Sequence, residues 1–147
     1  MVDGRGSMEG RVVRVCFFRL LEDEDLLVGI QERMNRSGVK AGYLMAIGAL
    51  KSAVLGLYHA GEYRYIRVNG PLELASCMGN VAINEKGETV IHAHVVVSDE
   101  KGAAFGGHLM KECIVSPTAE LTVAEALDVN LVRAFDDKTK LNLLKLT

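Results

Sequence analysis

Three of the four histidines in this 147-residue sequence fall within 17 positions and could share one metal ion. His92 and His94 are two residues apart in the segment IHAHVVV, whose valine-rich composition predicts a strand. Successive side chains of a strand point to opposite faces, so both imidazoles are expected on the same face. At about 3.3 Å per residue their α-carbons are roughly 6.5–7 Å apart, which allows two ring nitrogens to converge on one ion.

His108 follows this pair by 14 residues and could supply the third ligand, because that length allows a strand to leave, turn and return. Gly106 and Gly107 would let the returning backbone adopt unusual angles or pass close to a neighbour. Three neutral imidazoles suit Zn²⁺, although Ni²⁺, Co²⁺, Cu²⁺ or Fe²⁺ would also accept them. A fourth position would stay open to water, a carboxylate or another ligand, as in catalytic zinc sites.

The alternative interpretation is that these are ordinary hydrogen-bonded histidines. It is less favoured because two histidines on one face of a buried strand are costly without a shared purpose. His59 falls in a predicted turn around Gly61 and is interpreted as a surface residue. Glu73 and Glu120 lie in apolar strands where a carboxylate needs a partner, and Arg133 could pair with either of them.

One principal helix is predicted over residues 24–36, with Asp23 as its N-cap and Gly38 ending it in the left-handed conformation. Its apolar residues recur at helical spacing on one face: Leu26, Leu27, Ile30 and Met34. Residues 103–108 are expected to form a Gly-rich link, and residues 112–123 a strand interrupted by Pro117.

Most of the remaining segments are short apolar or alternating runs that predict strands. They are Arg11–Phe18, Ala41–Leu50, Ser52–Tyr58, Tyr63–Val68, Leu72–Ile83, Thr89–Ser98 and a last hairpin of Leu131–Phe135 with Leu141–Leu146. Parallel strands need crossovers that a single helix cannot supply. The predicted class is therefore α+β, a large and mostly antiparallel sheet or half-barrel with one helix packed on it. Residues 1–10 are interpreted as a loose N-terminal leader, and residues 11–147 as a single domain.

The overall composition is that of an ordinary globular domain, with 49% hydrophobic and 24% charged residues. A net charge of -2 and scattered lysines and arginines give no basic stripe for a nucleic-acid backbone, so direct DNA binding is not supported by charge. No apolar stretch reaches about 18 residues, so no membrane partner is expected. Cys16, Cys77 and Cys113 match no disulfide or zinc pattern. Cys16 and Cys77 lie in apolar runs and are interpreted as buried free thiols, which predicts a reducing, cytoplasmic location.

The sequence resembles the plant and prokaryote conserved (PPC) domain family, also called DUF296, from about Arg14 to Leu146. The resemblance is carried, in order, by Leu20, DEDLL at Asp23–Leu27, AIGAL at Ala46–Leu50, GPLELASCMGN at Gly70–Asn80, IHAHVVVSD at Ile91–Asp99, GGHL at Gly106–Leu109 and LVRAFDD at Leu131–Asp137. Asp23 and Lys140 stand where the family usually has glycine. The fold and histidine pattern are also remotely similar to acetolactate decarboxylase, a zinc lyase.

The resemblance implies a homotrimer of the prokaryotic single-domain type, with zinc at an H-x-H…H site that maps onto His92, His94 and His108. Related plant domains contact partners through a Gly-Arg-Phe-Glu-Ile-Leu segment, which here is Gly70, Pro71, Leu72, Glu73, Leu74 and Ala75. Proline replaces the arginine of that segment. Prokaryotic relatives are often labelled DNA-binding, so the resemblance leaves direct DNA binding as a partner to test.

The histidine pattern and the family resemblance leave three functions to consider. The first is a trimeric, zinc-binding PPC-domain protein of undefined molecular activity, regulatory or DNA-associated. The alternative is a zinc-dependent lyase or hydrolase acting on a small keto or hydroxy acid, because zinc polarises carbonyls and activates bound water. Arg64, Arg67 and Arg133 are the candidates for holding the carboxylate of such a substrate. A third role, in which the metal stabilises the trimer, is also open.

Overall fold

The computed structural model describes residues 6–145 and contains one helix and eight strands. The predicted leader lies partly outside the described residues, and its described part, residues 6–10, has no regular structure. The elements follow the chain as β1 (Arg11–Leu21), α1 (Leu26–Ser37), β2 (Gly42–His59), β3 (Glu62–Asn84), β4 (Thr89–Ser98), β5 (Ala104–Leu109), β6 (Ile114–Leu127), β7 (Val132–Asp136) and β8 (Leu141–Lys145). This confirms the predicted α+β class. Within residues 6–145, no helix has the length and apolar character needed to cross a membrane.

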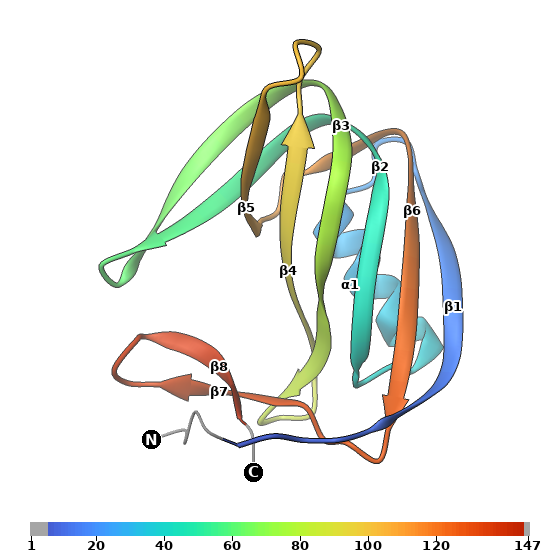
Figure 1. Cartoon of the computed structure of the whole chain (residues 1–147), viewed down its shortest axis with the longest axis vertical. Coiled ribbons are helices and arrows are strands. Elements are labelled where there is room, and N and C mark those ends of the chain that lie inside the picture. The colour runs from blue at the N-terminus through green and yellow to red at the C-terminus, as the bar shows by residue number, and fades with distance from the viewer. Residues whose placement is uncertain (1–5, 146–147) are drawn as a thin grey trace.

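All strands belong to one sheet in the order β1-β6-β2-β5-β4-β3-β7-β8, and β2 also pairs with β3 (Figure 1). Every pairing is antiparallel except the short one between β3 and β7. Beyond Leu50, β2 and β3 continue as a long hairpin over residues 52–69, here called the arm. The arm pairs with β5 through Leu55 opposite Leu109 and Gly56 opposite His108. Strands β2, β3, β4 and β5 therefore form a closed ring.

Several predicted boundaries are wrong in the same way, because strands continue through residues that usually end them. The two runs on either side of Lys51 are one strand, β2, and residues 62–84 form the single strand β3 through Pro71. The predicted Gly-rich link at residues 103–108 is largely strand β5. Strand β6 likewise passes through Pro117 without a break. The last hairpin, β7–β8, is confirmed.

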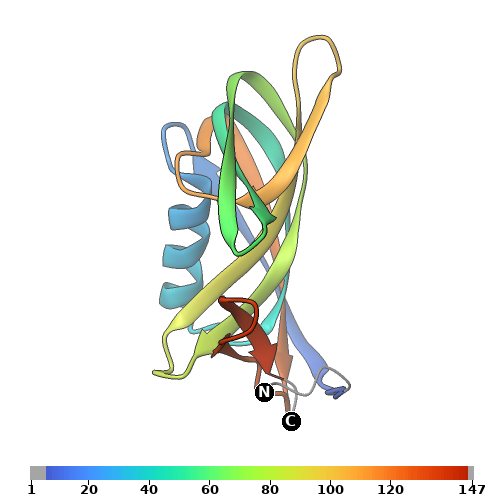
Figure 2. The same cartoon turned by 90° about the vertical axis from the view of Figure 1, so that its left-hand side faces the viewer.

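Helix α1 lies against one face of the sheet (Figure 2) and begins later than predicted. Its N-cap is Asp25, whose side chain accepts a hydrogen bond from the Val28 backbone N–H at 3.0 Å. Asp23, the predicted cap, lies before the helix with a left-handed φ of 70°. Gly38 ends the helix in the left-handed conformation, as predicted. The correction moves the helix from residues 24–36 to Leu26–Ser37.

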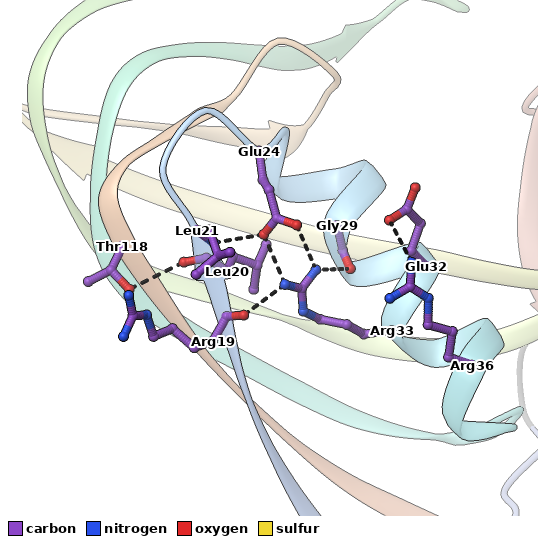
Figure 3. Close-up of polar contacts among 9 residues, drawn as sticks. All are labelled: Arg19, Leu20, Leu21, Glu24, Gly29, Glu32, Arg33, Arg36 and Thr118. Atoms are coloured by element: carbon purple, nitrogen blue, oxygen red, sulfur yellow. Dashed lines mark hydrogen bonds and ion pairs between the residues drawn. The ribbon is translucent and has the colours of Figure 1, made fainter.

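An arginine in the middle of α1 fixes the helix to the end of β1 (Figure 3). The Arg33 guanidinium donates to the Glu24 carboxylate at 2.9 Å and to the Arg19 carbonyl at 2.7 Å. It also donates to the Gly29 carbonyl one turn earlier, at 3.1 Å. A half-buried cation that bonds to a carboxylate and two carbonyls sets the position of the helix along the sheet. The apolar side of α1, including Ile30 and Met34, then packs into the core with the inward residues of the strands.

The sheet face opposite α1 exposes an unusual number of large apolar side chains. We call this surface the outer face. Its exposed apolar residues are Val15, Phe17, Tyr43, Met45, Ile47, Met78 and Val96. Phe17 is 77% exposed and Met78 53%. The pairing register places Met78 directly opposite His94 on the neighbouring strand. The outer face is therefore continuous with the strand that carries the histidine pair.

Candidate metal centre

Neighbouring strands of the ring bring the three predicted ligands together. His92 and His94 point to the same side of β4, while Ala93 and Val95 between and beside them are buried in the core. His108 on β5 is paired directly with His94. Each histidine offers one ligand atom, and these three atoms lie within 4.8 Å of one another. The ring centroids are 5.1–5.6 Å apart.

The donor set fits a divalent transition metal. In a tetrahedral zinc site with Zn–N bonds of about 2.0–2.1 Å, ligand nitrogens lie roughly 3.3 Å apart, so small side-chain rotations would close the site. His108 Nδ1 is buried without a hydrogen-bond partner among the described residues. Burial, followed by the charges of Arg133 and the other two histidines, lowers the pKa of His92 to about 4. Burial also lowers the pKa of His108, so both rings are neutral at pH 7, the form of imidazole that binds a metal.

The glycine before His108 is required by a close approach of two strands. A Cβ at Gly107 would lie 2.8 Å from the carbonyl oxygen of Gly56 and 3.1 Å from the Leu55 Cβ. This confirms the expectation that the returning backbone passes close to a neighbour. Gly106 is different, because a Cβ there would lie 3.4 Å from its nearest atom, an ordinary contact. Gly107 is therefore the residue that allows β5 to pack against β2 and carry His108 to the site.

Arg133, one of the three arginines that the sequence analysis named as carboxylate binders, contacts one of the three histidines. It pairs with neither Glu73 nor Glu120; instead its Nη2 donates to Nδ1 of His92 at 2.8 Å. Nη2 also donates to the Asn80 side-chain oxygen at 3.0 Å, and Nη1 donates to the Asn142 carbonyl at 3.1 Å. The parallel pairing of β7 with β3 places Arg133 beside Asn84, at the end of the strand that carries Asn80.

A cavity of about 340 Å³ adjoins the histidines and Arg133. It is lined by Tyr63, Val90, Ile91, His92, His108, Arg133, Lys140, Leu141, Asn142 and Leu143. Tyr63 comes from the arm, and its ring centroid is 5.4 Å from that of His108. Tyr58, also on the arm, donates to the Thr139 carbonyl in the β7–β8 turn. The cavity thus has the ring strands on one side and the arm and the last hairpin on the others.

The remaining candidates lie away from the histidines. His59 ends β2 at the exposed tip of the arm, as predicted. Arg64 and Arg67 are exposed on the arm, and Arg67 pairs with Glu112 at 3.1 Å. Of the three arginines considered as carboxylate binders, Arg133 is therefore the one that reaches the histidine cluster.

The predicted partner segment Gly70–Ala75 lies within β3, with alternating orientation. Leu72 and Leu74 are buried in the core, whereas Gly70, Pro71, Glu73 and Ala75 are exposed. A partner could therefore touch the exposed residues of the segment. Glu73 and Glu120 share a separate surface pocket of about 490 Å³.

Solved structures with nearly full coverage resemble this chain. The metal-containing protein from Archaeoglobus fulgidus is 32% identical, with a TM-score of 0.85 over 94% of this chain and 97% of that one. A plant- and prokaryote-conserved protein from Pyrococcus horikoshii is 30% identical, with a TM-score of 0.85 over 100% and 99% of the two chains. A candidate DNA-binding protein from Ralstonia eutropha is 25% identical with a TM-score of 0.79, over 89% and 90%.

Two further similarities cover only part of the other protein. A Staphylococcus aureus protein similar to α-acetolactate decarboxylase has a TM-score of 0.53 at 10% identity, covering 83% of this chain and 55% of that one. This confirms the remote likeness at the level of the fold alone. The bifunctional protein GlmU from Synechococcus sp. is 29% identical over 128 residues, or 86% of this chain and 20% of the relative. The chain thus spans about a fifth of the curated relatives that it matches.

The family model of the Plants and Prokaryotes Conserved domain matches residues 7–127. That range contains α1, the ring strands and all three histidines, and it ends before β7. The chain therefore belongs to the Plants and Prokaryotes Conserved domain family.

Proposed function

We propose that this protein binds a divalent transition metal, with zinc as the first candidate, at His92, His94 and His108. The observation that carries the proposal is the convergence of three histidine donor atoms within 4.8 Å on adjacent strands. The unpartnered, buried Nδ1 of His108 supports it, because a buried polar atom without a partner is costly. The relative from Archaeoglobus fulgidus, 32% identical, is named a metal-containing protein, which also supports it.

Elemental analysis tests this directly. Wild-type protein purified without added metal and then reconstituted with Zn²⁺ is expected to hold one ion per chain. His92→Ala and His108→Ala are each expected to lose most of that metal, because two imidazoles give a far weaker zinc site. His59→Ala is the matched control, since His59 is an exposed histidine at the arm tip, and it should retain the wild-type content. Equal metal content in all four proteins would refute the proposal.

We further propose that the chain assembles as the homotrimer implied by its family, with the outer face in the subunit interface. Contiguous exposed apolar patches mark interaction sites in soluble proteins. Here Phe17, Tyr43, Met45, Ile47 and Met78 are each more than 40% exposed, on β1, β2 and β3, and β6 connects β1 to β2 in the sheet. The metal site adjoins this face through His94, so the subunit interface and the metal site would lie next to each other.

Light scattering after size-exclusion chromatography tests the assembly. Wild-type protein is expected at about three times the chain mass of 16.0 kDa. The double substitution Phe17→Glu with Met45→Glu should give monomers, because it places unpaired carboxylates in a buried apolar contact. Val28→Glu, on the exposed side of α1, is the matched control and should remain trimeric. A wild-type mass of one chain, or a double variant that remains trimeric, would rule this interface out.

The proposed role is that of a metal-loaded binding module in a regulatory assembly. The match to about a fifth of a much longer bifunctional protein supports an accessory role for such a domain. A net charge of -2 does not favour direct contact with a DNA backbone, so DNA association would require a partner. The enzyme alternative is not favoured, because the likeness to the decarboxylase-like protein is one of fold alone.

A further inference from the structure

Arg133 carries a buried positive charge that the described residues do not neutralise. The residue is only 8% exposed, and it is the one charged residue in the buried set of residues 6–145. Its three hydrogen-bond acceptors are the neutral groups of Asn80, Asn142 and His92, and its Nε has no partner in that part of the chain. Burying a charge is costly unless it is paired, so this arginine calls for a negative partner.

The hydrogen bond from Arg133 to His92 conflicts with metal binding. Arginine is always a donor in proteins, so Nδ1 of His92 uses its lone pair to accept this bond. If Nδ1 were the metal ligand, its lone pair would bind the metal and could no longer accept a hydrogen bond from Arg133. If Nε2 were the ligand, the neutral imidazole would carry its proton on Nδ1 and would face a second donor. With a neutral His92, metal binding therefore releases the Nη2 donor of Arg133 beside the ion.

We propose that Arg133 and the three-histidine metal site form one composite site for a small carboxylate. One carboxylate oxygen would take the open position of the metal, and the other would accept from the released Arg133 donor. This inference rests on the proposed metal site and adds the class of ligand that it binds. An anionic ligand between the two cations would also remove the repulsion between the guanidinium and the metal.

The size and lining of the cavity indicate the chemical character of the rest of the ligand. Its volume of about 340 Å³ lies at the small end of the range for ligand pockets. Val90, Ile91, Leu141 and Leu143 line it together with Tyr63, so a short hydrocarbon tail would meet apolar walls. Lys140 also lines the cavity, but its Nζ lies 3.6 Å from Asp137, so part of its charge is already compensated. These features favour a small monocarboxylate over a polyanion.

A composite site makes metal binding and carboxylate binding reciprocal. The carboxylate would tighten metal binding, and the metal would tighten carboxylate binding by the same factor. Substituting Arg133 is expected to change the metal affinity in the opposite direction from substituting one of the three histidines. Arg133→Met would bind metal more tightly in the absence of carboxylate, since it removes both the competing hydrogen bond and the repulsive charge.

Titration with Co²⁺, followed by its visible absorption, tests the proposal at constant ionic strength with a weakly coordinating salt. Butyrate is expected to tighten Co²⁺ binding to wild-type protein by about fivefold or more, in the usual range of coupling between two sites, and to change the spectrum. Inorganic phosphate should have a smaller effect. Arg133→Met should bind Co²⁺ more tightly than wild type without butyrate and show no response to it. Arg64→Met, which removes an exposed arginine, should behave as wild type.

The following results would overturn the composite site. If wild-type protein binds no Co²⁺ or Zn²⁺, the proposed metal function fails and the inference fails with it. If Co²⁺ binds but butyrate changes neither affinity nor spectrum, only the inference fails. Equal butyrate responses in wild type and Arg133→Met would assign the effect to the metal alone. Should Arg133→Met not fold, Arg133→Lys replaces it, and an undiminished butyrate response there would equally contradict the role of the guanidinium.

Discussion

Stripping the metal from the loaded protein with a chelator is expected to lower its melting temperature by about 10 °C. A ligand that binds only the folded state, present at 1,000 times its Kd, stabilises that state by about 4 kcal/mol. For a chain of this size, each kcal/mol corresponds to a shift of roughly 2–4 °C. The ligands lie on β4 and β5, two strands of the closed ring, so the metal would link strands that meet only in the folded protein. Differential scanning calorimetry before and after dialysis against EDTA measures the shift.

The control for this experiment is His94→Ala measured under the same two conditions. This variant lacks one of the three ligands, so its melting temperature should be the same with and without EDTA. Light scattering on the same samples reports whether the proposed trimer survives metal removal. An unchanged melting temperature and mass in metal-free wild type would exclude a structural role for the metal. Whether the metal binds at all is decided separately by elemental analysis.

Gly107→Ala is expected to weaken metal binding about tenfold and to reduce the free energy of unfolding by about 1–3 kcal/mol. The added methyl group would lie 2.8 Å from the Gly56 carbonyl oxygen, which is backbone and cannot rotate away. Strand β5 would have to move off β2, and His108 is the next residue along β5. Urea denaturation of the metal-free protein and a Zn²⁺ competition titration measure the two effects separately.

The neighbouring glycine provides a matched control. A methyl group at Gly106 would lie 3.4 Å from the Val95 carbonyl oxygen, an ordinary contact. Gly106→Ala should therefore keep wild-type metal affinity, although it introduces the same atoms one residue away. If the two variants bind zinc equally well, the approach of β5 to β2 does not position His108, and our account of Gly107 is wrong.

The candidate site was predictable where it depends on strand periodicity. The H-x-H spacing alone indicated that His92 and His94 share a face, and the glycine pair before His108 indicated a close return. The family resemblance added a further signal. Asp23 and Lys140 stand where the family usually has glycine, and their φ values are 70° and 59°, in the left-handed region that glycine tolerates best.

Other features depend on contacts that no local pattern encodes. Asp23 and Asp25 are equally good capping residues by type, and the choice of Asp25 follows from a tertiary contact, its acceptance of the Glu112 backbone N–H at 2.5 Å. Arg133 reaches His92 across 41 positions, through the short parallel pairing of β7 with β3. The sequence analysis considered it as a partner of Glu73 or Glu120 and, with Arg64 and Arg67, as a carboxylate binder. No spacing rule connects it to the histidines.

The two walls of the cavity differ in how firmly they are held. The histidines stand on strands that pair on both sides. Within residues 6–145, the strand pairing of β7 with β3 covers only Ile83 with Val132 and Asn84 with Arg133, and the Tyr58–Thr139 hydrogen bond connects the β7–β8 turn to the arm. Segments with few such connections open locally at a lower free energy than the core of a sheet. We therefore expect the β7–β8 hairpin, which carries Arg133, to open locally at a lower free energy than the strands that carry the three imidazoles. The fold thus places the three histidines on strands paired on both sides and the charge of Arg133 on a hairpin with a shorter pairing to the sheet.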